Sequence, residues 1–308
     1  MTRGGFPFPV DIYYQTDDKL EGVYHRGQNK IWDGKKVLSS ALKKYGLPQI
    51  DAEKQIAVEA LFSIILWGEY AAWNVSSQLS SMLDDYGAKM AAVSQAHDEA
   101  RHFYVMRDYL QTLGHHPRPL PAPVQYILES VLETPDLARK LLGMQLMIEP
   151  VALTIFRFVK KSNVDPVLTE LLGYFEIDES RHVALGVKYL PKILKRMSKF
   201  EMMNFLLWQA RMIRAEIQGL KYMEPYLITL GMDPLEVFEF TEQRQIECLK
   251  MVTLEMGLGD SLWAPIVKLI DFQKHLMFRS NPKASFLRRF GNSFISTFLT
   301  SYTTEPHS

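Results

Sequence analysis

The chain has 308 residues, of which 47 % are hydrophobic and 23 % are charged, and its 35 basic residues balance its 35 acidic residues. Such a composition is typical of a globular protein with a sizeable core, and the balanced charge excludes an overall electrostatic attraction to nucleic acid or to an anionic membrane. The single cysteine, Cys248, excludes intrachain disulfides and thiolate metal clusters and favours a reducing compartment.

The N-terminal residues contain no uninterrupted apolar stretch of the kind found in a signal peptide. The longest apolar run covers about residues 60–67. It is far shorter than the ~20 residues that a membrane-spanning helix needs. We therefore expect a cytoplasmic protein without a membrane span.

Helical patterns dominate the chain from residue 51 onward, and no stretch alternates with the period of two that marks a β-strand. The segment 1–50 is mixed in composition and predicts an N-terminal wrap over the core. The predicted helices cover about residues 27–32, 35–45, 51–85, 89–113, 124–133, 200–223, 234–256 and 261–277, besides a pair on either side of residues 162–166. Residues 280–308 predict a partly ordered tail.

A five-residue motif occurs twice: Asp98-Glu-Ala-Arg-His102 returns 80 residues later as Asp178-Glu-Ser-Arg-His182. At ordinary residue frequencies the pattern arises in roughly one chain in a thousand of this length, so two copies are not accidental. Each copy also has a lone glutamate, Glu69 or Glu149, 30 residues before its own glutamate.

Turn signals lie midway between the paired glutamates, at Asp84–Gly87 for the first pair and at Ser162–Pro166 for the second. Each pair therefore predicts an antiparallel helical hairpin in which the two glutamates face each other. The proline-rich segment 114–123 between the hairpins predicts one long crossover. We expect residues 51–198 to form an all-α four-helix bundle, with additional helices from residues 199–279 packed on it.

The motif has the spacing of a metal site, because residues i and i+3 share a helix face. A glutamate from each of two helices, with Glu-x-x-His from each of the other two, is the di-iron carboxylate pattern of four-helix bundles. Oxygen ligands with one imidazole per ion favour iron or manganese, so we predict two iron ions, with Mn/Fe as the other pair. No catalytic residue is predicted beyond the metal site. The predicted ligands are Glu69, Glu99, His102, Glu149, Glu179 and His182.

The residues beside the ligands predict a supporting layer. Metal-bound imidazoles usually donate their other N–H to a carboxylate, and Asp98 and Asp178 are placed for that role, across the bundle or locally. Arg101 and Arg181 can pair with these aspartates through bidentate contacts.

The doubled Glu…Asp-Glu-x-Arg-His pattern resembles that of the ferritin-like di-iron oxidases and oxygenases. Multicomponent monooxygenase hydroxylases, acyl-carrier-protein desaturases and the small subunit of class I ribonucleotide reductase belong to this superfamily. The resemblance covers roughly residues 51–198. It implies a reduced two-metal site that reacts with O2 and oxidises a bound organic molecule by hydroxylation, N-oxygenation or desaturation.

Two departures narrow the choice within the superfamily. Met106 stands one turn after the first motif histidine, where ribonucleotide reductase small subunits carry a radical tyrosine, although Tyr104 and Tyr109 are nearby. Phe175 stands where arylamine N-oxygenases add a third histidine. A radical-generating or Mn/Fe ligand-binding oxidase is the first alternative, and iron storage or detoxification is the second.

Helical spacing from the ligands also suggests a pocket for a hydrophobic or aromatic substrate. The chain shows no flavin or nicotinamide motif, so a separate ferredoxin or reductase is expected to supply electrons. The superfamily suggests a homodimer. The predicted pocket residues are Leu66, Ala72, Trp73, Met106, Leu153 and Gly186.

Overall fold

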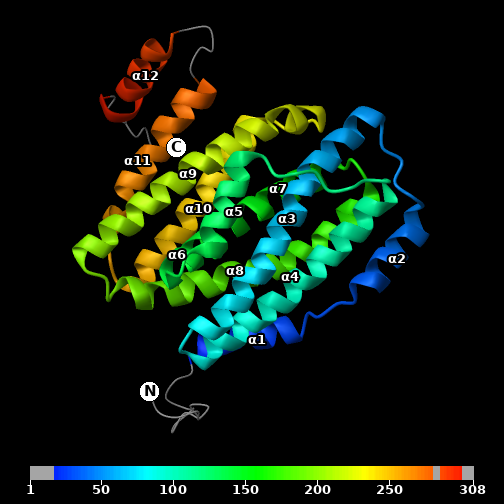
Figure 1. Cartoon of the computed structure of the whole chain (residues 1–308), viewed down its shortest axis with the longest axis horizontal. Coiled ribbons are helices and arrows are strands. Elements are labelled where there is room, and N and C mark those ends of the chain that lie inside the picture. The colour runs from blue at the N-terminus through cyan, green and yellow to red at the C-terminus, as the bar shows by residue number, and fades with distance from the viewer. Residues whose placement is uncertain (1–16, 280–284, 300–308) are drawn as a thin grey trace, which may run out of the picture.

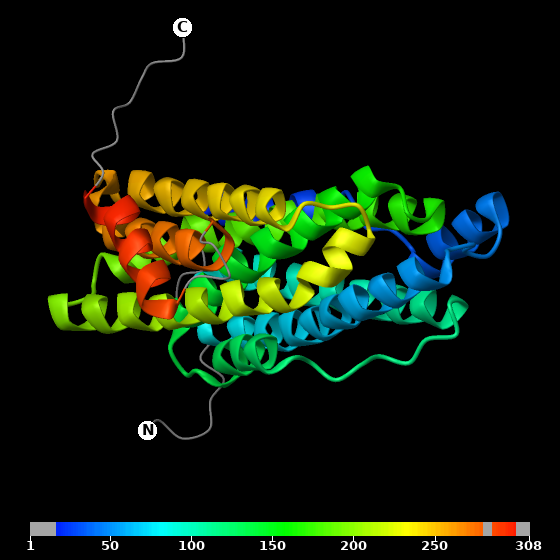
Figure 2. The ribbon, with the colours of Figure 1, turned by 90° about the horizontal axis from the view of Figure 1, so that it is seen from above.

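The computed structural model describes residues 17–279 and 285–299, and every regular element in these ranges is a helix (Figure 1). The chain is therefore all-α, as predicted. The helices of the central bundle are α3 (Ala52–Met82), α4 (Tyr86–Thr112), α7 (Glu149–Ser162) and α8 (Pro166–Leu194). These long helices run roughly parallel or antiparallel to one another along the molecule (Figure 2).

The first hairpin joins α3 to α4 at the predicted turn. The side chain of Asp85 caps α4 by accepting a hydrogen bond from the backbone N–H of Ala88 at 2.9 Å. Gly87 follows the cap, and a Cβ atom there would lie 2.7 Å from the backbone nitrogen of Glu21. Glycine at this position therefore lets the N-terminal helix α1 (Asp18–Gln28) lie directly against the turn.

The second hairpin joins α7 to α8, also at the predicted turn. Asn163 ends α7 in a left-handed conformation with φ of 48°. Asp165 caps α8 by accepting from the N–H of Leu168 at 2.8 Å, and Pro166 occupies the first helical turn. The hydroxyl of Tyr109 donates to the same carboxylate at 3.0 Å and so ties the second turn to α4.

The predicted long crossover connects α4 to α5 (Ala122–Glu133) and runs along α3. The indole N–H of Trp67 donates to the carbonyl of Arg118 at 3.0 Å, and the N–H of Arg118 donates to the hydroxyl of Ser63 at 3.1 Å. A short helix, α6 (Leu137–Leu141), follows.

A π-helical segment, η2 (Leu142–Ile148), lies between α6 and α7 and leads directly into Glu149. No sequence pattern predicted this π-helical segment. Pro150 has no N–H, and its ring would clash with the carbonyl four residues earlier in a regular α-helix. The wider turn changes the hydrogen-bond pattern at this point and accommodates the proline.

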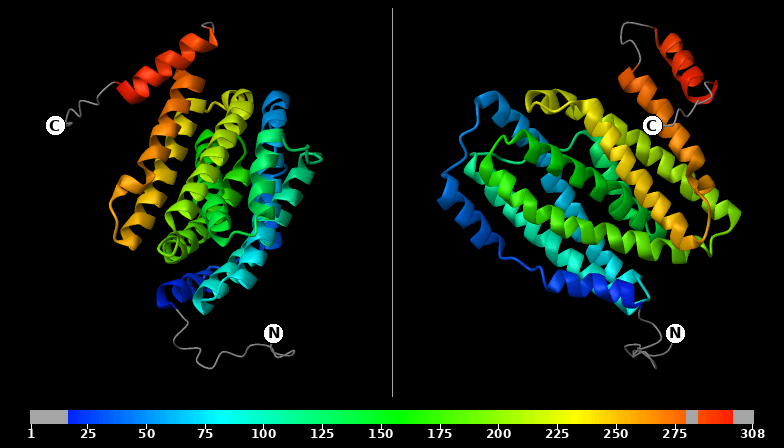
Figure 3. Two further views of the ribbon diagram at one scale, coloured as in Figure 1. Left: turned by 60° about the vertical axis from the view of Figure 1, so that its left-hand side comes forward. Right: turned by 180° about the vertical axis from the view of Figure 1, so that it is seen from behind.

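The N-terminal residues form two helices, α1 and α2 (Gly34–Tyr45), which pack on α4 and α8 (Figure 3). The predicted helix at 27–32 is wrong, because α1 ends at Gln28. Gly22 and Gly27 both lie within α1, whose first turn is capped by the Asp17 carboxylate.

The C-terminal helices between residues 199 and 256 pack on the other side of the bundle (Figure 3). The predicted helix 234–256 is confirmed, whereas the one predicted at 200–223 continues to Thr229 through Pro225. Part of the predicted tail is helical, and its residues 280–284 and 300–308 lie outside the described residues. The elements are α9 (Lys199–Thr229), α10 (Pro234–Met256), η3 (Asp260–Trp263), α11 (Ala264–Lys274), η4 (His275–Arg279), α12 (Phe286–Phe294) and η5 (Ile295–Leu299).

Two helical stretches, Ala52–Met82 and Leu137–Ser162, are long and apolar enough to cross a membrane. Within their most apolar windows, however, 61 % and 78 % of the residues are buried inside the molecule. Packing in the bundle core therefore accounts for their hydrophobicity.

Candidate metal centre

The structure brings the six predicted ligands together in the interior of the bundle, where none is more than 4 % exposed. They form two groups whose ligand atoms lie within 4.8 Å of one another. One group contains Glu69 and His102, the other contains Glu149 and His182, and both include Glu99 and Glu179. The arrangement therefore has two separate ends joined by two shared carboxylates.

At the first end, the Nδ1 atom of His102 lies 3.3 Å from Glu69 Oε2, 3.4 Å from Glu99 Oε2 and 3.1 Å from Glu179 Oε1. Two donor atoms bound at right angles to one ion, each at about 2.1 Å, lie about 3 Å apart. These separations therefore fit a single ion held among the four side chains.

At the second end, the Nδ1 atom of His182 lies 2.9 Å from Glu99 Oε1, 2.7 Å from Glu179 Oε2 and 3.8 Å from Glu149 Oε1. Glu99 and Glu179 thus present one carboxylate oxygen to each imidazole. This is the orientation that two bridging carboxylates need.

Several ligand atoms at the first end lack a hydrogen bond. Glu99 Oε2, His102 Nδ1 and Glu179 Oε1 are buried and have no hydrogen-bond partner. Buried polar atoms are nearly always satisfied, and a metal ion would satisfy all three at once. Two divalent ions would also neutralise the four carboxylates, so the residues present fit a two-metal centre.

Without metal, the cluster must hold protons. Burial raises the pKa of both Glu69 and Glu149 well above the ordinary value. Burial alone would lower the pKa of His102 and His182, but the surrounding carboxylates outweigh it and raise both values. The imidazoles in turn lower the pKa of Glu99 and Glu179 against the opposing effect of burial. Metal must therefore displace protons from the four groups with a raised pKa, which are Glu69, Glu149, His102 and His182.

Metal affinity is accordingly expected to rise with pH. The four groups with raised pKa favour their protonated forms, so binding releases up to four protons per chain, and acid opposes binding. Titration of the metal-free protein with Mn(II) in weakly buffered solution, followed by a pH electrode, measures the release. Affinity that is equal at pH 6 and pH 8, with no proton release, would contradict this protonation pattern.

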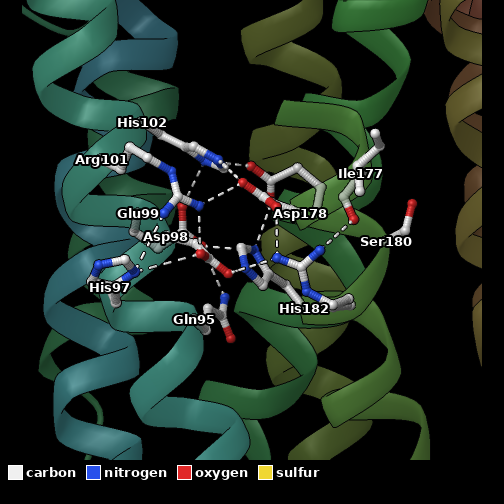
Figure 4. A network of polar contacts seen from close by, with 12 residues as sticks. Gln95, His97, Asp98, Glu99, Arg101, His102, Ile177, Asp178, Ser180 and His182 are labelled. Carbon is white, nitrogen blue, oxygen red and sulfur yellow. Dashed lines mark hydrogen bonds and ion pairs between the residues drawn. The ribbon is translucent and has the colours of Figure 1, made fainter. Parts of the chain in front are cut away.

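The four residues of the predicted supporting layer lie together, and each aspartate contacts the histidine of the other motif across the bundle. His102 Nε2 donates to Asp178 Oδ2 at 3.0 Å, and His182 Nε2 lies 3.4 Å from Asp98 Oδ2 (Figure 4). Each histidine is thus supported by the aspartate of the other motif. A proton on Nε2 leaves Nδ1 free to bind an ion.

Two arginines, Arg101 and Arg181, connect the two aspartates, because each guanidinium contacts both carboxylates (Figure 4). The cross-bundle distances are 2.8 Å from Arg101 to Asp178 and 3.0 Å from Arg181 to Asp98. The two positive and two negative charges cancel, so the layer adds no net charge to the cluster. It holds α4 and α8 in the rotation that points the histidines at the carboxylates.

Sequence reasoning missed Gln95, whose amide touches two of the ligands. Its Nε2 donates to Glu99 Oε1 at 3.1 Å and to Glu149 Oε1 at 2.8 Å. Gln145 of η2 donates in turn to Gln95 Oε1 at 3.1 Å. Gln95 lies four residues before Glu99 on the same helix face, and that spacing was the available signal.

Replacing Gln95 with leucine is expected to weaken metal binding about tenfold, the lower end of the cost of losing such a support. The variant leaves Glu99 and Glu149 without the donor that orients them. Competition with a chelator of known affinity measures the change. The matched control is Gln111→Leu on the exposed face of the same helix, which should bind as the parent does. Equal affinities in all three proteins would refute the orienting role.

Two aromatic residues complete the surroundings of His102. Trp32, from the segment before α2, donates its indole N–H to Asp178 Oδ2 at 2.8 Å, and its ring lies 4.7 Å from the Arg101 guanidinium. Phe175 stacks on the His102 ring with centroids 4.2 Å apart. No pattern in the sequence indicated the role of Trp32, because it depends on the path of the N-terminal segment.

An apolar cavity of about 100 Å³ lies against the metal centre, lined by Glu69 and Glu149; we call it the metal-side cavity. Its walls come from α3, α5, η2, α7 and α9. Apart from those two glutamates and Glu216, the lining is apolar or glycine. Lining residues include Ile65, Gly68, Ala72, Ile127, Met147, Ala152 and Leu220.

The predicted pocket residues need correction, since only Ala72 of the six lines this cavity. Leu66 and Met106 are fully packed in the core, and Trp73 is 38 % exposed and packs on Phe103. Leu153 lines a different cavity, between α7, α8 and α10. A Cβ atom on Gly186 would lie 2.7 Å from Gln145 Cβ, so this glycine permits close helix packing instead of opening a pocket.

The comparisons with known proteins bear on the fold. No family model matches the chain, and no curated protein matches it in sequence. A solved structure from Bacillus halodurans, provisionally named a class I ribonucleotide reductase, is similar with a TM-score of 0.52 and 12 % identity over 81 % of this chain and 96 % of that one. A variant of an R2-like ligand-binding oxidase with a Mn/Fe cofactor shares 16 % identity over 85 % of this chain and 94 % of its own, with a TM-score of 0.47.

The first of these likenesses shows the fold. The chain has the ferritin-like helical fold that the doubled motif predicted. Its buried carboxylates and histidines are able to hold two metal ions.

Proposed function

We propose that the protein is an O2-activating di-iron oxidoreductase that acts on an apolar small organic molecule. The observation that carries this proposal is the meeting of two features: ligand groups joined by Glu99 and Glu179, and an apolar cavity against Glu69 and Glu149. A metal centre with an apolar chamber on one side suits oxidation of a bound organic molecule. The proposed reaction is hydroxylation, N-oxygenation or desaturation.

Two bound iron ions, or a Mn/Fe pair, would supply the redox chemistry toward O2. The chain's own residues would hold the ions and exclude bulk water from them. Glu99 and Glu179 face both imidazoles and would hold both ions, whereas Glu69 and Glu149 each belong to one end and border the cavity. The apolar lining positions the substrate and keeps bulk water away from the reacting face.

Electrons for repeated turnover are proposed to come from a separate ferredoxin or reductase. The principal competing function is a radical-generating or Mn/Fe ligand-binding oxidase. Met106, fully buried one turn beyond His102, stands where a radical tyrosine would be expected, so this position favours substrate oxidation.

Metal analysis combined with oxygen kinetics tests the proposal. Anaerobic loading with Fe(II) should give two irons per chain, and mixing with O2 should produce an absorbance change whose decay an apolar candidate substrate accelerates. Uptake of many irons per chain would instead indicate storage. A persistent tyrosyl signal in electron paramagnetic resonance, insensitive to substrates, would indicate radical generation.

A further inference from the structure

A second cavity, of about 40 Å³, adjoins the metal-side cavity and is enclosed by α7, α9, α10 and α11; we call it the distal cavity. The two cavities share four lining residues: Val151, Glu216, Leu220 and Met223. The metal-side cavity borders the ligands Glu69 and Glu149, and the distal cavity reaches Ile270 of α11. Glu216 stands at their junction.

Glu216 is held in place by Gln245 of α10. The amide Nε2 of Gln245 donates to Glu216 Oε1 at 2.6 Å and to the carbonyl of Met147 at 3.2 Å. Among the described residues, Glu216 has no other hydrogen-bond partner and no ion pair. Its second carboxyl oxygen is therefore available to a molecule in the cavities.

The surroundings favour an uncharged carboxyl group. Within the part of the chain that the structure describes, neither cavity is lined by lysine, arginine or histidine. The other carboxylate of the distal cavity, Glu242, is paired with Lys274 at 2.8 Å. Burial raises the pKa of Glu216 to about 8. A neutral carboxyl group can donate one hydrogen bond and accept others.

A polar group beside an apolar cavity lowers the stability of the fold unless a partner completes its hydrogen bonds. A carboxyl group that faces apolar walls with a single hydrogen-bond partner is unfavourable, and a leucine would pack against the same walls without that cost. Packing alone therefore does not explain the pair of Glu216 and Gln245. A polar atom delivered by a ligand would complete the hydrogen bonding.

We propose that Glu216, oriented by Gln245, is the anchor for an uncharged polar group of an otherwise apolar substrate. The group is a hydroxyl, carbonyl or amide, and the apolar part of the molecule occupies the metal-side cavity. This inference deepens the proposed function and rests on it. Glu216 is a specificity-determining residue here, separate from the metal ligands.

Binding of a matched series of probes to the metal-loaded, anaerobic protein tests the anchor. Isothermal titration calorimetry compares benzyl alcohol, toluene, benzylamine and benzoate. We expect benzyl alcohol to bind most tightly. One hydrogen bond to a neutral group corresponds to about a five- to tenfold change in affinity.

Two substitutions at Glu216 separate hydrogen bonding from charge and shape. Glu216→Gln keeps a donor and an acceptor without the charge, so benzyl alcohol should bind within about threefold of the parent. Glu216→Leu removes both, so the affinity for benzyl alcohol should fall five- to tenfold while that for toluene is unchanged or improved. Gln245→Leu leaves Glu216 in place without its support, and it should lower the preference for benzyl alcohol over toluene. This variant tests the anchor independently if a substitution at Glu216 prevents folding.

Equal affinity for benzyl alcohol in the parent, Glu216→Leu and Gln245→Leu would overturn the proposal. Tightest binding of benzylamine, abolished by Glu216→Gln, would also overturn it, because it would assign a site for a cation. Metal content and O2 uptake are measured on the same samples. Fewer than two metals per chain in the parent would refute the proposed function. If the variants contain two metals per chain but select among the probes as the parent does, the anchor alone is refuted.

Discussion

Replacing Glu179 with glutamine is expected to reduce the metal content from two ions per chain to one or none. Glu179 presents one oxygen toward each imidazole, at 3.1 Å from His102 Nδ1 and 2.7 Å from His182 Nδ1. The amide keeps the shape of the side chain but loses the negative charge and one of the two oxygen ligands. It cannot bridge two cations as a carboxylate does. Inductively coupled plasma mass spectrometry of the reconstituted protein measures the outcome.

The matched control for this substitution is Glu176→Gln on the same helix. Glu176 pairs with Lys160 at 2.6 Å and belongs to neither ligand group, so this variant should keep two ions per chain. Glu99→Gln provides an independent repeat, because Glu99 also faces both imidazoles. The O2-dependent absorbance change should be lost in both bridging variants. Retention of two tightly bound ions by Glu179→Gln would disprove the bridging assignment.

Replacing Arg101 with methionine is expected to lower the free energy of unfolding of the metal-free protein by about 3 kcal/mol, the lower end of the cost of breaking a buried ion pair. The guanidinium is 4 % exposed and contacts both Asp98 and Asp178. Its removal leaves the two buried aspartates with Arg181 as their remaining guanidinium partner. Urea unfolding followed by circular dichroism measures the change.

The same variant should also weaken metal binding, because Asp178 is the acceptor that orients His102. Arg107→Met is the matched control on α4: its ion pair with Asp108 is 47 % exposed on the arginine side and should contribute at most about 1 kcal/mol. If Arg101→Met and Arg107→Met unfold at the same urea concentration, the buried four-charge layer does not stabilise the bundle as described here.

The hairpins and the six candidate ligands could be predicted because they depend on local chemistry. The i, i+3 spacing places Glu99 beside His102 whatever the rest of the chain does. Asp85 and Asp165 cap helices through hydrogen bonds to residues three positions later. Each turn is therefore determined by a short stretch of sequence. Equal arm lengths on each side of those turns then bring the glutamates to the same level of the bundle.

The pocket could not be predicted in the same way. Leu66 and Met106 lie at helical spacing from the ligands but face neighbouring helices, and both are buried in the core. The cavity opens instead toward α5 and α9, which lie outside the doubled motif. Which face of a bundle is left open depends on the helices that cover it, and the motif carries no information about them.

The sequence by itself determined an all-α chain with two similar hairpins and a cluster of carboxylates and histidines able to hold two metal ions, because capping and helical periodicity act over a few residues. Only the tertiary structure decided that each histidine is supported by the aspartate of the other motif, and that Gln95 bridges to Glu149. It also decided that Trp32 and Glu216 reach the centre and its cavities. These contacts join residues far apart in the chain, so they depend on how the packed helices are rotated and spaced.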